Sequence, residues 1–251
     1  MKKTYLIMII IFFVLTNTLI SKDTDKDNSL DFDIGLVFKA GSAEIVFNNS
    51  ELKNDLAFII TALRVDFDIS NYIKLGIIAG YQQNHFNDSI NAVNLPLSLG
   101  FPEDNSNSML FGFIIESEPF SIDDFVLDIN FEFNYYKSFL KSWKIELPIA
   151  IGTAESNNSF YKTTLSFLFK YEGFANFTPY IGPNLSLISG KLSLSENIME
   201  IEAEEIMKYS QKNLIGLSAG VKFEVGDNWD IGLKLNLFSE KSIYLSAFYI
   251  F

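Results

Sequence analysis

The sequence predicts an all-β protein: a transmembrane antiparallel up-and-down β-barrel of about 12 strands, with 10 as the alternative count. Apolar and polar residues alternate with a period of two along most of the chain. The last segment, Ser242 to Phe251, is such a strand, and Ile243, Leu245, Ala247, Tyr249 and Phe251 share one side of it. The chain has no cysteine but 25 Phe and 11 Tyr. Strands without disulfides that carry an apolar outer side are stable as a closed barrel in lipid.

The N-terminus predicts export. Lys2 and Lys3 precede a largely apolar run at 5–20, which is shorter than the ~20 residues of a spanning helix. Residues 1–21 therefore resemble a cleaved signal peptide, with an uncleaved anchor as the alternative. Residues 22–28 then form a short periplasmic segment and 29–251 the barrel. Loss of the two lysines takes the net charge from −12 to −14, which argues against nucleic acid and against a basic patch for anionic lipid.

The expected strands follow one another along the chain. They lie at 30–39, 57–69, 73–82, 95–101, 109–115, 124–135, 143–152, 162–172, 180–187, 215–225, 229–237 and 242–251. An interpretation of 84–121 as one long loop reduces the count to 10. Either even number puts both ends on the periplasmic side. The connections at 40–54, 84–93, 118–122, 153–159, 195–211 and 239–241 are then outside, and those at 70–71, 102–107, 137–141, 173–176 and 226–228 inside.

The two faces of these strands predict two environments. The apolar side faces lipid, and rings near the strand ends indicate an interfacial girdle: Tyr72, Tyr81, Tyr135, Trp143, Tyr171 and Trp229. The other side carries mixed charges, which favour a hydrated lumen over the dry core of the alternative, a soluble exported β-protein. The predicted lumen-lining residues are Asp31, Asp33, Arg64, Asp66, Asp68, Lys74, Asp128, Glu132, Lys144, Glu146, Lys170, Glu172, Lys222, Glu224, Asp230 and Lys234. Bulky inward residues such as Phe58, Ile60 and Tyr244 predict a partly filled interior.

The ending on Tyr249 and Phe251 resembles the C-terminal signature of bacterial outer-membrane β-barrel proteins. The segments Tyr180-Ile181-Gly182-Pro183 and Ala219-Gly220-Val221-Lys222-Phe223 look like phrases of the same porin-like grouping. The resemblance covers the mature chain and implies residence in the cell outer membrane. It also implies contact with outer-membrane lipid and a lipopolysaccharide-type surface, and Tyr249 and Phe251 as a signal to the barrel-assembly machinery. It brings no catalytic residues.

The sequence predicts that the chain is not an enzyme. The single histidine, His85, has Asn87 where outer-membrane phospholipases have a serine, and it is expected to be an exposed loop residue. Asp66 and Asp68 share a face as omptin-type proteases require, but they lie at the periplasmic end. No metal or cofactor is expected, because the chain lacks the ligand spacings that such sites need.

The acidic stretch from Glu196 to Glu205 is expected to form a short loop helix with a stripe at Met199, Ala203, Ile206 and Ser210. It is interpreted as a solvated loop, or as a segment that folds into the barrel mouth. Three functions stay open at this point: a narrow pore or structural surface protein, a surface protein that binds a ligand through its loops, and a lipid-modifying barrel enzyme.

Overall fold

The computed structural model describes residues 32–48, 53–70, 72–87, 90–91, 100–101, 106–147, 150–199, 201–226 and 228–251. Every regular element in these residues is a strand. They are β1 (Phe32–Phe47), β2 (Lys53–Ser70), β3 (Ile73–Phe86), β4 (Ile90–Asn91), β5 (Gly100–Phe101), β6 (Ser106–Ile122), β7 (Phe125–Ser138), β8 (Lys141–Leu147), β9 (Ala150–Tyr171), β10 (Phe177–Ile198), β11 (Ile201–Gln211), β12 (Ile215–Val225), β13 (Trp229–Leu237) and β14 (Lys241–Ile250). No helix in the described part of the chain is long and apolar enough to cross a membrane.

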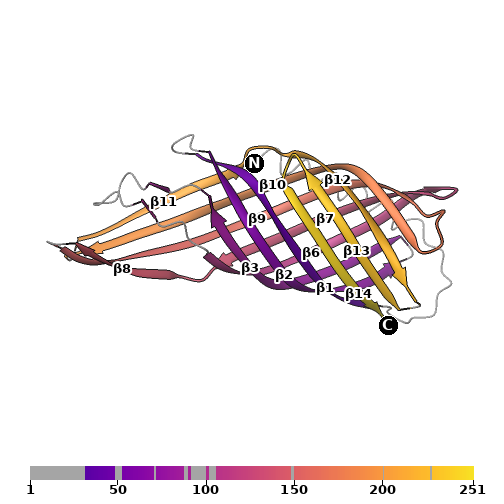
Figure 1. Cartoon of the computed structure of the whole chain (residues 1–251), viewed down its shortest axis with the longest axis horizontal. Coiled ribbons are helices and arrows are strands. Elements are labelled where there is room, and N and C mark those ends of the chain that lie inside the picture. The colour runs from indigo at the N-terminus through magenta and orange to yellow at the C-terminus, as the bar shows by residue number, and fades with distance from the viewer. Residues whose placement is uncertain are drawn as a thin grey trace.

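Ten strands close into an antiparallel ring in the order β1-β2-β3-β6-β7-β9-β10-β12-β13-β14, and β14 pairs back to β1 (Figure 1). This confirms the predicted all-β barrel, with the alternative count of 10 in the ring. The start of β1 and the end of β14 lie together, since Asp33 pairs with Ile250. We call this the terminal end, and the opposite end of the barrel the distal end.

The distal end is built differently from the terminal end. β9 and β10 run on past the ring, where β8 pairs with β9 and β11 pairs with β10. β11 also pairs with β1 from Ile45 to Phe47. Because β12, β13 and β14 have ended by this level, β11 takes their place and the distal ring has eight strands, β1-β2-β3-β6-β7-β9-β10-β11. The projecting strands β8, β10 and β11 form the left-hand tip in Figure 1.

One residue pair links the end of β11 to β1, where the distal ring closes. The backbone N–H of Lys212 donates to the carbonyl of Glu44 at 2.9 Å, and the Lys212 ammonium lies 2.6 Å from the Glu44 carboxylate. The hydrogen bond from Lys212 holds the pKa of the Glu44 carboxyl below its usual value. The contact joins residues far apart in the sequence and completes the distal ring.

The apolar side chains point outward in the terminal half of the barrel and inward in the distal half. In the terminal half the outward residues are apolar and exposed, among them Leu36 at 63%, Ile77 at 54% and Phe111 at 56%. In the distal half the inward residues are the apolar ones, and Ile45 and Leu56 are each 0% exposed. An apolar exterior belongs in hydrocarbon and an apolar interior belongs in water. The terminal half therefore spans the bilayer, and the distal half stands outside it.

Aromatic rings mark the two edges of the apolar belt. Tyr135 lies opposite Tyr161 on the distal edge, and Trp229 lies opposite Tyr249 on the terminal edge. These rings fit the interfacial girdle that the sequence predicts. Trp143 was wrongly placed in that girdle, because it lies in β8 and packs inward against the apolar core.

Three predicted elements differ from the structure. Of the expected strand at 95–101, only Gly100–Phe101 falls in the described residues, as β5 paired with β4, and the next strand of the ring is β6. The expected strand at 143–152 is divided between β8 and the start of β9, which form a hairpin beside the ring. The loop helix around Met199 and Ile206 is wrong, because Ile201–Gln211 is strand β11.

These differences also reverse three connections. Residues 118–122 end β6, and the turn at Asp123 and Asp124 that follows lies at the terminal end, although it was predicted outside. Residues 106 and 107, from the connection predicted inside at 102–107, begin β6 at the distal end. Residues 137–141 also lie at the distal end, although they were predicted inside. The sequence predicted one ring strand too many before β6 and another after β7. These two errors offset each other, so the number of strands in the ring stays even and the remaining connections lie on their predicted sides.

Candidate functional site

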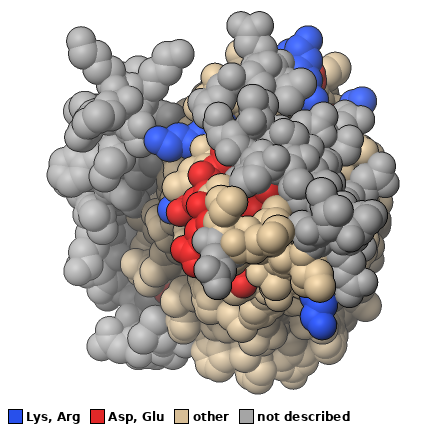
Figure 2. Space-filling view, turned by 90° about the vertical axis from the view of Figure 1, so that its left-hand side faces the viewer, with Lys and Arg blue, Asp and Glu red and all other residues tan. Residues whose placement is uncertain are grey.

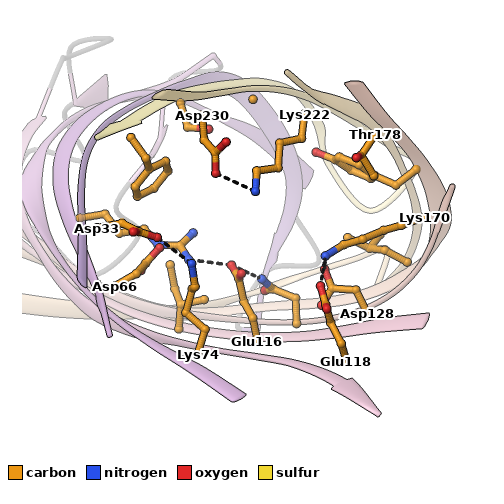
Figure 3. Close-up of a pocket in the computed structure, with 18 of the residues that line it drawn as sticks. Asp33, Asp66, Lys74, Glu116, Glu118, Asp128, Lys170, Thr178, Lys222 and Asp230 are labelled. Atoms are coloured by element: carbon orange, nitrogen blue, oxygen red, sulfur yellow. Dashed lines mark hydrogen bonds and ion pairs between the residues drawn. The ribbon is translucent and has the colours of Figure 1, made fainter. Parts of the chain in front are cut away.

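The terminal half of the barrel encloses a charged vestibule of about 380 Å³ (Figure 3). Inward positions of the ring strands supply its walls. Of the residues predicted to line the lumen, the vestibule is lined by Asp33, Arg64, Asp66, Asp68, Lys74, Asp128, Glu132, Lys170, Glu172, Lys222, Glu224, Asp230 and Lys234. The even spacing of these charges along each strand places them together, because alternate residues face the same side.

Ion pairs link the charges around the wall. Arg64 contacts Asp66 and Glu116, each at 2.6 Å, and so joins β2 to β6. Lys170 of β9 lies 3.0 Å from Asp128, and Lys222 of β12 lies 2.7 Å from Asp230 (Figure 3). Such pairs satisfy charges that would otherwise be costly inside the barrel. They hold the wall rigid and leave the centre of the vestibule to water.

Two of the predicted lumen residues lie elsewhere, and a third is not described. Asp31 lies outside the described residues. Lys144 was wrongly placed in the lumen: its side chain is exposed on β8, which pairs, among the described residues, with β9 alone and lies beside the ring. Ile145, its neighbour, is the buried one, because this hairpin stands beyond the membrane and turns its apolar side inward. The strand of Glu146 lies outside the ring for the same reason.

Three inward carboxylates were not predicted from the sequence. Glu116 and Glu118 follow Ile114 on the inner face of β6, and alternation with Phe113 and Ile115 was a signal that could have found Glu116. Glu240 was placed in an outer connection. Its turn instead carries it into the lumen, where it is 4% exposed. No local pattern around Ser239 and Lys241 indicates this position.

Glu240 is the centre of a buried polar cluster above the vestibule. Lys39 reaches it at 2.6 Å from β1, and Lys162 contacts its other carboxylate oxygen from β9. Asn236 and Ser242 donate hydrogen bonds to its Oε1 at 3.0 and 2.8 Å. Two cations from different walls thus converge on one anion, and the cluster crosses the lumen.

Beyond this cluster, apolar side chains fill the distal lumen. They are Val37, Ala43, Ile45, Phe47, Leu56, Phe58, Ile60, Ala62, Ile78, Phe86, Leu110, Tyr136, Phe160, Ile188, Leu192, Leu194, Met207 and Tyr209, all buried in one contiguous core. Their rings interlock: Tyr136 stacks on Phe160 at 4.4 Å, and Phe47 meets Tyr209 edge-on at 5.6 Å. Packing of this kind excludes water. The lumen, predicted to be partly filled, holds in its distal half a contiguous apolar core, beside which polar side chains such as Gln82, Asn84 and Asn158 are also buried.

The residues considered for catalysis or metal binding do not converge. His85 lies in β3, not in a loop, and pairs with Ala57 near the distal end. Asp66 pairs with Gly76 near the other end of that strand, about 30 Å away at the rise of an extended chain. In the described part of the chain, no group of His, Cys, Asp and Glu side chains is arranged to hold a metal ion.

Comparison with known proteins agrees with this architecture. Residues 120–239 match the family model described as Opacity family porin protein, which is less than half of the chain. The chain is a bacterial outer-membrane β-barrel protein. Its family match and its membrane-type exterior place it in the outer membrane, as a barrel porin or surface protein. No curated protein matches this barrel protein.

Several solved outer-membrane barrels are similar to it. The outer membrane protease OmpT from Escherichia coli is 10% identical with a TM-score of 0.47, covering 92% of this chain and 99% of that chain. The outer membrane protein OprG from Pseudomonas aeruginosa is 12% identical with a TM-score of 0.37, covering 91% and 99%. Ail, the attachment invasion locus protein of Yersinia pestis, is 11% identical with a TM-score of 0.31, covering 88% and 99%.

One of these matches corrects a prediction. The sequence interpretation excluded enzymatic activity from this outer-membrane barrel. That exclusion was wrong, because the barrels it is similar to include a protease.

Proposed function

We propose that this protein is a closed surface barrel, in which the membrane half is an anchor and the distal half is the part presented to the surroundings. The observation that carries this is the apolar core, which fills the lumen from wall to wall between the vestibule and the distal end. A vestibule that ends at a dry core is not a free path for solutes. The mixed charges below it, joined by Arg64 and Lys170, act as internal bracing for the anchor.

The apolar core is a barrier to hydrated ions. An ion that leaves the vestibule must first pass the Glu240 cluster and then shed its water among side chains such as Phe58 and Ile188. Transfer of an unpaired charge into such surroundings costs tens of kcal/mol by idealised solvation estimates. An apolar constriction without water is a closed gate. The folded barrel is therefore expected not to conduct ions steadily.

Planar-bilayer recording of the full-length mature protein tests the proposal. The native barrel is expected to show no steady conductance steps. A variant with Phe58→Ser, Tyr136→Ser and Tyr209→Ser, which hollows the core, is expected to conduct if it inserts. Tyr135→Ser, which alters the neighbouring outward ring, is the control and is expected to stay silent. Steady, cation-biased steps from the native barrel would overturn the proposal whatever the variants do.

The parts that face the surroundings are the projecting strands. β8, β9, β10 and β11 form a sheet beyond the membrane whose tip exposes Ile151, Met199 and Ile201. Replacement of 197–202 by a short Gly-Asn turn leaves the ring intact. It is expected to abolish contact with any partner bound by this tip while the heat-modifiable folded form persists. Retained adhesion of cells that carry this variant would exclude the tip as the contact surface.

We also propose the finer partners of the barrel. Its apolar belt contacts outer-membrane lipid, and its outer edge contacts a lipopolysaccharide-type surface. Tyr249 and Phe251 at the end of β14 serve as a signal to the barrel-assembly machinery. Cleavage after residue 21 and a short periplasmic segment at 22–28 remain predictions, which N-terminal sequencing of the mature protein checks.

A further inference from the structure

Three lysines form a row across the outer face of the barrel. Lys137 of β7 pairs with Ser159 of β9, Ser159 pairs with Lys191 of β10, and Lys191 pairs with Lys208 of β11. All three lysines are exposed. Neighbouring strands are about 4.8 Å apart, so the row places three ammonium groups within about 15 Å.

The row has no internal counter-charge. None of the three lysines forms an ion pair with a residue in the described part of the chain, whereas Lys212, directly after the end of β11, is paired with Glu44. Like charges on directly opposed residues, as at Lys191 and Lys208, destabilise a sheet. The three ammonium groups repel one another, and no carboxylate of the described residues pairs with them. This indicates that an anion from outside the chain neutralises them.

The height of the row matches the membrane surface. Tyr135 and Tyr161 mark the distal edge of the apolar belt, and Lys137 and Ser159 lie two residues farther along the same strands. At about 3.3 Å per residue this is roughly 7 Å beyond the ring of tyrosines. Aromatic girdles lie at the level of the headgroups, so the lysines reach the phosphate groups of the outer leaflet.

A hollow of about 410 Å³ is lined by two lysines of this row, Lys137 and Lys191, together with several serines and one asparagine. Lys208 lies beside it, paired with Lys191. Lys137, Leu140, Glu155, Ser156, Asn157, Ser159, Lys191, Ser193, Leu194, Ser195 and Glu204 line it. Its two carboxylates, Glu155 and Glu204, both pair with Ser195, which lies four residues beyond Lys191. The lysines therefore face the membrane and the acids face the water.

We propose that this hollow binds the phosphate-bearing headgroup of an outer-leaflet lipid, with the lysine row on the phosphate and the serine and asparagine side chains on the sugar or glycerol hydroxyls. The proposal rests on the lipid contact proposed above and not on whether the lumen conducts. It also revises the expectation, drawn from the net charge of −12, that no basic patch serves anionic lipid. The strand register brings lysines from β7, β10 and β11 together, although the chain as a whole is acidic.

The positions of the charges on the outer face favour a lipid over a soluble anion, because the carboxylates lie farther from the membrane than the lysines. Acids gather on the distal end of the molecule (Figure 2), and Glu155, Glu202 and Glu204 line the next hollow outward. A free anion that approaches from water meets these carboxylates before it meets the lysines. A lipid phosphate is already on the membrane side of them.

The test measures lipid retention by the full-length barrel. Native mass spectrometry compares phosphatidylcholine with diphosphoryl lipid A for the native protein, a row variant (K137Q, K191Q, K208Q) and a control variant (K53Q, K144Q, K241Q). The control removes the same charge from exposed positions outside the row. The native and control proteins are expected to prefer the phosphorylated lipid, and the row variant is expected to lose that preference by roughly tenfold or more.

Three outcomes overturn the proposal: unchanged preference in the row variant, an equal loss in the control variant, or displacement of the lipid by millimolar inorganic phosphate, which would indicate a site for soluble anions. Insertion into neutral vesicles is measured on the same samples. If the native protein fails to insert there, the outer-membrane assignment fails with it. If both variants insert normally, the outcome speaks for the lysine row alone.

Discussion

The ring of Tyr136 stacks on the ring of Phe160 inside the distal core, with centroids 4.4 Å apart and planes 12° apart. The two residues come from neighbouring strands β7 and β9, and both point into the lumen. The adjacent residue Tyr135 points the other way and is 43% exposed on the lipid-facing side. One dipeptide thus contributes to the membrane girdle and to the core that closes the barrel.

This relationship gives a stability prediction. Tyr136→Ala removes a fully buried ring from a packed core and is expected to lower the free energy of unfolding by about 3–5 kcal/mol. Tyr135→Ala, with the same chemical change one residue away, is expected to cost clearly less, because its ring lies at the lipid interface. Urea unfolding in lipid vesicles, followed by tryptophan fluorescence, measures both. Equal losses would show that the distal lumen is not tightly packed.

Glu240 gives a second prediction, because it is the shared counter-ion of Lys39 and Lys162. Glu240→Gln leaves two buried ammonium groups without their carboxylate, and a broken buried pair costs about 3–5 kcal/mol. Adding Lys162→Met to that variant is expected to recover part of the loss.

The control for this prediction is Glu224→Gln. Glu224 also lines the vestibule but is exposed there, so its replacement is expected to change stability by about 0.5 kcal/mol or less. Denaturant titration of the four proteins in the same detergent gives the comparison. If Glu240→Gln were as mild as Glu224→Gln, the cluster would be hydrated rather than buried.

Two glycines on the inner wall of the barrel, Gly182 of β10 and Gly232 of β13, give a third prediction. A Cβ added at Gly182 would clash with the backbone carbonyl of Phe167, which has no freedom to move. A Cβ added at Gly232 would meet the side-chain hydroxyl of Ser246 at 2.5 Å, and that hydroxyl can rotate away. Gly182→Ala is therefore expected to lose about 1–3 kcal/mol, and Gly232→Ala less. The fraction of heat-modifiable folded protein after refolding ranks them, and the reverse order would contradict this reading of the wall.

The sequence was sufficient to predict the membrane half of the barrel, because hydrocarbon imposes a strict alternation on strands such as 124–135 and 229–237. It was insufficient for the distal half. In β11 the inward residues include Glu205 and the outward ones include Ile206, so the alternation is broken. The pairing of Phe47 with Tyr209 joins residues distant in sequence, and no local pattern indicates that β11 replaces three strands of the ring.

The residues of the candidate site were likewise predictable in the membrane half of the barrel and not outside it. The vestibule charges were predictable because each lies on the inner face of a membrane strand. Lys144 was misplaced because its hairpin stands in water, where the rule for which face is apolar is reversed. Glu240 was missed because a turn, not a strand, directs it inward, and turns carry no periodicity.

The seam between β14 and β1 gives the last prediction. Phe251 stacks on Phe32 with centroids 4.8 Å apart and planes 15° apart, and Tyr249 meets Phe251 edge-on at 4.8 Å. If Phe251 is an assembly signal, Phe251→Ala is expected to reduce the folded barrel in the outer membrane of cells severalfold, while refolding of the purified variant in detergent is unchanged.

Phe223→Ala is the matched control, since Phe223 is also an outward ring near the terminal end but lies on β12. It is expected to leave assembly in cells unaltered. The heat-modifiable band on a gel measures the folded form in both settings. Equal loss in cells and in detergent would assign Phe251 to closing the seam against Phe32 rather than to recognition by the assembly machinery. Normal assembly of Phe251→Ala in cells would remove it from both roles.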